Sequence, residues 1–134
     1  MLKRLAIVLG LGFLVLTPIA NANTLQPISQ SSLGITCTDP INNWRGVYPT
    51  ESITITFNEK ITQGDPLKAI TLTDSNGKVL ESVNTINYNI LTIKPVKSLY
   101  FNSRYTITIP ATAVSDSYNN TLTQDYSLSF TTVK

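Results

Sequence analysis

The sequence contains no histidine, only one cysteine, and one methionine, which is Met1. Histidine is the commonest general base and metal ligand in proteins, so its absence argues against most hydrolytic and metal-dependent chemistry. No histidine is present to activate Cys37, and a single cysteine cannot form an internal disulfide. We therefore expect no enzyme, no cofactor and no metal. Cys37 is expected to be a small half-buried residue in a first strand, with a free thiol or pairing between chains as the alternatives.

Charged residues make up only 13% of the chain, and they form no run of one sign. Nucleic-acid binding needs a basic patch or stripe, which is missing, as are a glycine-rich phosphate loop and cysteine spacing typical of zinc sites. The eight carboxylates are scattered among expected turns and strand ends. No stretch after the N-terminal segment has a sustained helical period with caps. These absences exclude nucleic acid as a partner and leave structural and binding roles.

The one long hydrophobic run lies at the start of the chain. Lys3 and Arg4 precede an apolar stretch from Leu5 to Ala20, and Ala20-Asn21-Ala22 offers small residues for a signal peptidase. This pattern predicts a signal peptide over residues 1–22, cleaved after Ala22, and a secreted or cell-surface protein. The alternative is an uncleaved membrane anchor, although the apolar run is shorter than the roughly 20 residues that span a bilayer.

The part after the predicted cleavage site has the length of one domain. Residues 23–32 are polar and without periodicity, which predicts a flexible lead-in, and residues 33–134 would form the domain. The signal segment carries two of the ten basic residues, so the remaining eight balance the eight acidic ones. The processed protein is therefore expected to be nearly neutral.

Alternating apolar and polar residues dominate the expected domain. Ile53, Ile55 and Phe57 alternate with threonine, and the same period of two returns at Ile107 and Leu128. Such patterning in segments rich in threonine, isoleucine and tyrosine predicts half-buried strands, and about seven short strands separated by turns favour an all-β antiparallel sandwich. The expected strands cover residues 33–38, 51–58, 67–74, 78–84, 86–94, 103–110 and 124–132.

Turn residues separate these strands. Asn76-Gly77 follows one alternating run and precedes another, and this dipeptide favours a tight hairpin. Pro49, Pro66, Pro95 and Pro110 fall at expected strand ends, where a missing N–H costs least.

One segment carries a more particular pattern. Leu99, a short corner and then Tyr105 at the start of a strand look like the tyrosine corner of immunoglobulin-like sandwiches. The order L…Y-T-I-T-I…A-V-x-D-x-x-x-N…F-T-T, after a P-x-x-x-I-x-I-x-F strand, resembles the prokaryotic SbsA-type Ig-like domain, also called bacterial Ig-like domain group 5. The resemblance runs from about residue 37 to residue 132. It implies a single Ig-like sandwich in a prokaryotic surface or secreted protein, usually without catalytic activity.

The chain departs from this family at two loop positions. Asn102 stands where many relatives have glycine, and Asp116-Ser117-Tyr118-Asn119-Asn120 replaces D-x-x-G-N. Asparagine tolerates positive φ better than most residues, so we expect positive φ at Asn102 and Asn119. Asp116 and Asn120 are expected to bond to local backbone N–H groups in a structural turn. A calcium site is the alternative, although one carboxylate with side-chain amides falls short of the usual ligand set.

Exposed aromatic side chains are the candidates for binding. Such side chains can stack on sugars or anchor a protein partner, whereas the alternative is that Trp44 and Phe101 cap the ends of the core. The candidates in or near expected loops are Trp44, Tyr48, Tyr88, Tyr100, Phe101 and Tyr118.

These observations favour an exported, non-catalytic protein with a structural, adhesive or protein-interaction role at the prokaryotic cell surface. A surface protein or polysaccharide is the expected partner, and a membrane only through an uncleaved signal segment. The alternatives are a carbohydrate-binding module that uses the loop aromatics and, third, a metal-handling sandwich of the copper-resistance type. The lack of histidine and of any methionine after Met1 disfavours the third. Open sheet edges also offer binding by strand addition.

Overall fold

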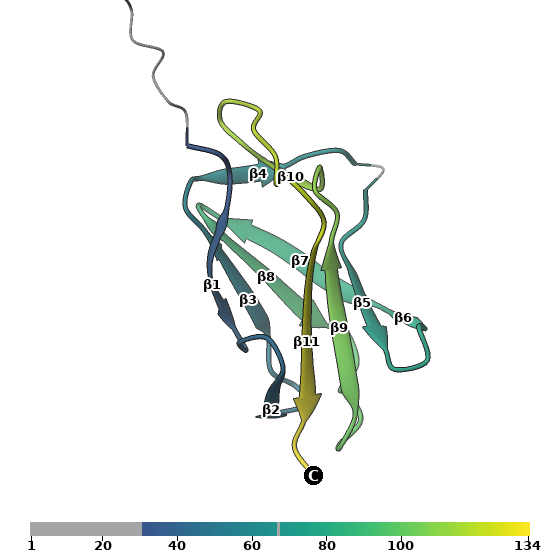
Figure 1. The fold of residues 1–134 in the computed structure, drawn as a ribbon. Helices are drawn as coiled ribbons and strands as arrows, with labels where there is room; N and C mark the ends of the chain where they lie inside the picture. The colour runs from purple at the N-terminus through teal and green to yellow at the C-terminus, as the bar shows by residue number, and fades with distance from the viewer. Residues whose placement is uncertain (1–30, 67) are drawn as a thin grey trace, which may run out of the picture.

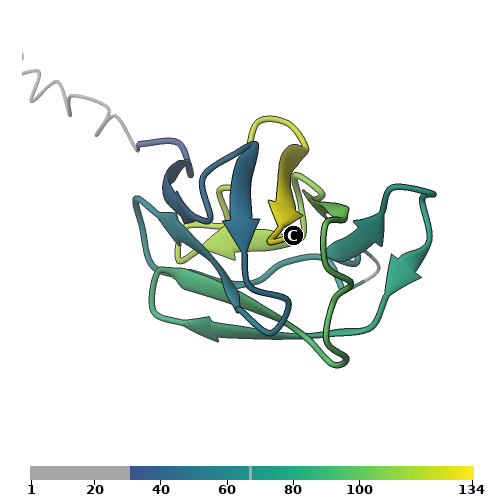
Figure 2. The same cartoon turned by 90° about the horizontal axis from the view of Figure 1, so that it is seen from below.

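Two β-sheets packed face to face form the protein, as the computed structural model shows (Figures 1 and 2). The structure describes residues 31–66 and 68–134. The predicted signal peptide and most of the predicted lead-in lie outside the described residues. Within those ranges the chain forms eleven strands and no helix, and so no helix long and apolar enough to cross a membrane. The fold is an all-β Ig-like sandwich.

The first sheet has four antiparallel strands in the order β1-β3-β8-β7. In each central strand every second side chain is buried, because successive side chains in a strand point to opposite faces. The threonines between them face solvent. The strands are β1 (Ile35–Asp39), β3 (Ile53–Phe57), β7 (Ser82–Asn87) and β8 (Ile90–Pro95).

The second sheet has five strands in the order β2-β11-β9-β5-β6. Its pairs are antiparallel except for β2 and β11, which run parallel at one edge of the predicted antiparallel sandwich. A separate two-stranded ribbon of β4 (Ile61–Gln63) and β10 (Val114–Asp116) covers one end. The strands of the five-stranded sheet are β2 (Trp44–Val47), β5 (Thr71–Asp74), β6 (Val79–Leu80), β9 (Arg104–Ile109) and β11 (Tyr126–Thr132).

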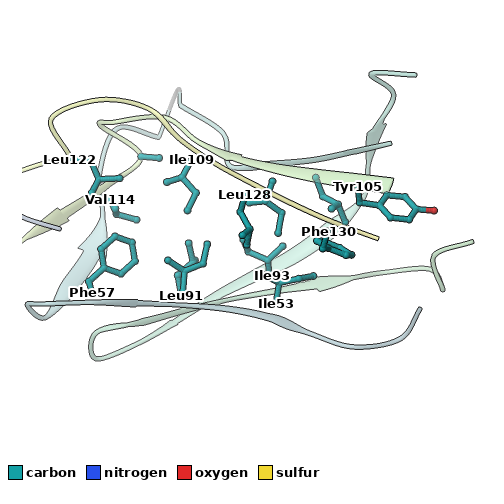
Figure 3. Packing of buried hydrophobic residues seen from close by; sticks show 14 of the residues in the cluster. Ile53, Phe57, Leu91, Ile93, Tyr105, Ile109, Val114, Leu122, Leu128 and Phe130 are labelled. Carbon is teal, nitrogen blue, oxygen red and sulfur yellow. The ribbon is translucent and has the colours of Figure 1, made fainter. Parts of the chain in front are cut away.

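The core consists of the apolar side chains that alternate along both sheets. Ile53 and Leu91 from one sheet face Ile109 and Leu128 from the other, and none of the four is exposed (Figure 3). Burying a side chain of this size contributes about 1.5–3 kcal/mol relative to leaving it in water. The prediction that these alternating residues point inward is confirmed.

Three short strands were not predicted from the sequence. β2, β4 and β10 contain only three or four residues each, which is too short for a period of two to stand out in the sequence. Two boundaries also differ. The expected strand over residues 78–84 is divided at Glu81, where the chain passes from β6 in one sheet to β7 in the other, and the turn at Tyr88 and Asn89 interrupts the expected strand over residues 86–94.

Cys37 lies in β1 with a free and exposed thiol, so the expectation of a half-buried side chain is wrong. A register shift between Ile35 and Cys37 explains this, because an extra residue at a bulge changes which side chains face inward. Cys37 pairs with Thr56, whose side chain belongs to the outer face of the sheet.

The hairpin predicted at Asn76-Gly77 is present between β5 and β6. Asp74 organises it, since its Oδ1 accepts the backbone N–H groups of Asn76 and Lys78 at 2.9 and 3.0 Å. The φ of +78° at Gly77 suits glycine, which pays no steric penalty there. The described chain enters near the β4–β10 ribbon, and its C-terminus lies at the opposite end of the sandwich (Figure 1).

Candidate functional site

Four exposed apolar side chains lie at the end of the sandwich that holds the C-terminus: Tyr48, Val96, Tyr100 and Phe101, which we call the aromatic end. Tyr48, Tyr100 and Phe101 are 67%, 80% and 62% exposed. They come from two loops far apart in sequence, joined by a hydrogen bond of 3.0 Å from the Leu99 N–H to the Pro49 carbonyl oxygen. The fold therefore joins two loops that carry exposed aromatic residues and that lie far apart in sequence.

The backbone of Tyr100 is held on both sides. Its N–H donates to the hydroxyl of Tyr105 at 2.9 Å, which is the backbone hydrogen bond that a tyrosine corner requires. Its carbonyl oxygen accepts the Thr132 hydroxyl at 2.6 Å. The Tyr105 ring is buried and packs against Phe130 with centroids 5.8 Å apart. A rigid frame thus presents an almost fully exposed Tyr100 ring.

The turn that follows is fixed in the same way. Asn102 has φ of +49°, as predicted, and its N–H donates to the Val133 carbonyl oxygen at 2.6 Å. The Val133 N–H in turn donates to the Val47 carbonyl oxygen at 2.9 Å. These bonds tie the last residues of the chain to both loops of the aromatic end.

A cleft of about 320 Å³ opens beside Tyr100, between the β5–β6 hairpin and the corner before β9. Charged side chains of both signs line it, and no ion pair forms among them in this part of the described chain. The charged residues of the cleft are Asp74, Lys78, Glu81 and Lys97. Sequence reasoning did not predict this cleft, since its walls come from separate turns.

The other three candidate aromatics lie outside the two loops of the aromatic end. Tyr88, with φ of +56°, belongs to the turn between β7 and β8, and Tyr118 lies in the loop after β10, so both are at the opposite end. Trp44 begins β2 rather than lying in a loop. Trp44 and Phe101 both remain more than half exposed, so a large part of each ring is open to a partner.

The asparagine-rich loop after β10 is built around Asp116. The Oδ1 of Asp116 accepts the backbone N–H groups of Tyr118 and Asn120, both at 2.8 Å. Its Oδ2 accepts the Asn120 side-chain amide at 2.8 Å. The backbone carbonyl oxygen of Asn120 accepts the Asp116 N–H at 3.0 Å, so both residues bond to local backbone N–H groups, as predicted. Asn119 has φ of +65°, as predicted.

Hydrogen bonding lowers the pKa of Asp116. Burial by itself raises the pKa of this carboxyl, but the bonds from the Asn120 side chain, the Asn120 N–H and the Tyr118 N–H outweigh it and hold the pKa below the ordinary 3.8. Both carboxylate oxygens are thus engaged with donors. In residues 31–66 and 68–134 no three histidine, cysteine, aspartate or glutamate side chains lie together as a metal site would require. The loop is therefore a structural turn organised by a carboxylate.

Comparison with known proteins agrees with this architecture. A family model described as bacterial Ig-like domain matches residues 29–132. The fold is similar to the crystal structure of CopC from Methylosinus trichosporium OB3b, with a TM-score of 0.59 and 15% identity over 75% of this chain and 93% of that one.

The fold is also similar to the N-terminal part of the bacterial S-layer protein SbsC, with a TM-score of 0.56 and 14% identity. That match covers 78% of this chain but 24% of the other, so this chain spans about a quarter of that structure. No curated protein matches the chain. At these identities the solved structures show a shared fold.

Proposed function

Since the chain belongs to the bacterial Ig-like domain family, we propose that it is an exported adhesive domain that binds another macromolecule through its aromatic end. The family and the similar structures support a non-catalytic domain of the cell surface, the periplasm or the extracellular space. Secretion by a cleaved signal peptide belongs to the same proposal, as does adhesion at the cell surface. Export is supported by the apolar N-terminal segment with small residues at its end.

The observation that carries the proposal is the rigid exposure of Tyr100. A large ring that is 80% exposed, on a backbone bonded through both its N–H and its carbonyl, is ready to bind without first being ordered. Aromatic side chains are enriched among the residues that contribute most to interfaces. Tyr48 and Phe101 extend the same surface, and Val96 adds a further apolar contact.

A carbohydrate ligand is the second candidate, and the cleft beside Tyr100 favours it. Its volume of about 320 Å³ lies at the lower bound for small-molecule sites, and its wall carries both hydrogen-bond donors and acceptors. A sugar could stack on the Tyr100 ring while Asp74, Glu81 or a lysine binds its hydroxyl groups. This candidate places a smaller ligand at the edge of the same surface.

The test is binding of the processed protein to isolated cell envelopes and to insoluble polysaccharides. We expect a Tyr100→Ala/Phe101→Ala double variant to lose at least tenfold in affinity for envelopes. The matched control is Tyr88→Ala/Tyr118→Ala, which removes two rings of similar exposure at the opposite end. Equal binding by both double variants would refute a role for the aromatic end.

Competition with free oligosaccharides and protease treatment of the envelopes distinguish a polysaccharide ligand from a protein partner. If the ligand is a polysaccharide, free oligosaccharides will displace the protein from envelopes, and Glu81→Gln will weaken binding together with Tyr100→Ala. If the partner is a protein, protease treatment of the envelopes will abolish binding and oligosaccharides will have no effect.

A further inference from the structure

Strand β7 forms one edge of the four-stranded sheet, and it lacks the features with which proteins protect such edges. Its one neighbour among the described strands is β8. Over six residues, Ser82–Asn87, it has no charge, no proline, no glycine and no register shift, and most of its residues are exposed. An unprotected edge of this length is a template for pairing with another strand.

The other three edges of the two packed sheets are protected in different ways. β1 contains a register shift and ends at Asp39-Pro40. β2 is four residues long and contains Arg45 and Gly46, and β6 has only two residues. Short strands, charges, prolines and bulges all discourage edge pairing. Selective protection of three edges marks the fourth as the place for an added strand.

The pairing with β8 determines which backbone groups of β7 are free. The turn at Tyr88 and Asn89 closes on the pair Asn87–Ile90, and the closing pair of a two-residue hairpin is hydrogen-bonded. Because bonded and non-bonded pairs alternate, Val83 and Thr85 bond to β8. Ser82, Asn84 and Ile86 therefore direct their N–H and C=O groups to the open side.

We propose that this edge binds the β7 strand of a second copy of the chain, antiparallel and about a two-fold axis at Asn84. In this register Asn84 faces itself, Ser82 faces Ile86 and Val83 faces Thr85 of the second copy. Three residues on each strand then exchange backbone hydrogen bonds. The Val83–Thr85 pairs bring β-branched side chains together, which favours sheet pairing.

The chemistry of the strand argues for a second copy as the occupant. The strand is uncharged, so two copies meet without like charges facing each other. The exposed apolar side chains of Val83 and Ile86 would be partly covered by the same pairing. On the inner side a groove of about 320 Å³, lined by Ile70, Ile86 and Leu91 among others, leaves room for the small inward side chains of Ser82 and Asn84 from the second copy. An isologous pairing of this kind closes after two chains.

The test is the mass of the processed protein in solution over a range of concentrations. We expect a reversible dimer, and we expect Asn84→Lys and Asn84→Glu each to weaken dimerisation at least tenfold, because each places like charges face to face. Mixing the two variants should restore a dimer. Asn76→Lys is the matched control, with the same change of charge in an exposed turn away from β7, and it should dimerise like the parent.

Hydrogen exchange gives a second readout that does not depend on substitutions. The amides of Ser82, Asn84 and Ile86 should become more protected as protein concentration rises, whereas those of Val83 and Thr85 should change little. A parent protein that stays monomeric at millimolar concentration would overturn the proposal. So would a monomer that pairs with an extended segment of a different protein through β7, or an unchanged dimer in both charged variants. The dimer is tested by substitutions at Asn84 and the aromatic end by substitutions at Tyr100 and Phe101, so the failure of one proposal can be told from the failure of the other.

Discussion

The buried hydroxyl of Thr132 donates a hydrogen bond to the carbonyl oxygen of Tyr100, 2.6 Å away. It also accepts the Ser103 N–H at 3.0 Å, so one side chain at the end of β11 fixes the corner before β9. With the Tyr105 hydroxyl on the other side, this arrangement leaves Tyr100 little backbone freedom. The rigid surface proposed for binding thus depends on two buried hydroxyl groups.

Removing either hydroxyl should loosen the corner. We expect Thr132→Val and Tyr105→Phe each to lower the free energy of unfolding by about 1 kcal/mol, because each removes a hydrogen bond that holds the Tyr100 backbone. Urea unfolding measures the loss, and envelope binding should fall in parallel. Ser127→Ala, on the exposed side of the same strand, is the control. Full stability in both hydroxyl variants would show that the corner does not need these bonds.

The hydrogen bonds to Asp116 should make the free energy of unfolding depend on pH in acidic solution. The pKa of Asp116 is lower in the folded protein than in the unfolded chain, so the ionised carboxylate stabilises the folded state. This stabilisation is fully present above the unfolded-state pKa and is lost as the pH falls through the folded-state pKa. The unfolded carboxyl titrates near pH 3.9, so the loss should begin below about pH 4 and continue toward lower pH. The midpoint of urea unfolding, followed from pH 7 to pH 2.5, measures it.

The matched variant for this loop is Asp116→Asn. Its amide would place a donor where Oδ2 now accepts the Asn120 amide, so we expect a less stable protein at pH 7. The difference between parent and variant should shrink as the pH falls below 4. A constant difference across the whole pH range would contradict the role given to the carboxylate.

The sandwich core predicts a sharp contrast between neighbouring residues of β11. Leu128 is fully buried and Ser127 is exposed, although they are adjacent in sequence. We expect Leu128→Ala to lower the free energy of unfolding by about 2–5 kcal/mol, and Ser127→Ala to change it by at most about 0.5 kcal/mol. Chemical denaturation checks both. Similar losses for the two variants would mean that the alternation does not define the core.

Substitution of alanine for glycine should lower the stability of the protein by different amounts at Gly64 and Gly77. A Cβ at Gly64 would collide with the carbonyl oxygen of Thr112, whereas at Gly77 nothing lies within 4 Å. We expect Gly64→Ala to lower the free energy of unfolding by about 3 kcal/mol through overpacking against backbone. Gly77→Ala should cost about 1 kcal/mol, from its positive φ alone. Thermal and urea unfolding should rank them in this order, and the reverse order would contradict the close approach at Gly64.

Much of the fold could be predicted because its signals are local. The alternation of apolar and polar residues in Ile53–Phe57 and in Arg104–Ile109 predicts both the strand and the face of it that is buried. The positive φ at Asn102 and Asn119 follows from the tolerance of asparagine for that conformation. The family resemblance is confirmed by the match to residues 29–132.

The elements that could not be predicted depend on distant partners. β4 pairs with β10, and β2 pairs with β11 at the far end of the chain. A segment such as Trp44–Val47 has no alternation of its own, so only its place beside β11 makes it a strand. Likewise each aromatic residue was visible in the sequence, but the grouping of Tyr48 with Tyr100 results from the bond between Leu99 and Pro49.

The described chain enters the sandwich at one pole and leaves it at the other, beside Tyr100 and Phe101 (Figure 1). A tether through the N-terminal side would therefore hold the aromatic rings outermost, one domain length away from the point of attachment. Under tension between such a tether and a bound partner, the strands would be loaded along their length. The backbone hydrogen bonds between neighbouring strands would then be sheared together rather than opened one at a time, which would suit the adhesive role proposed above.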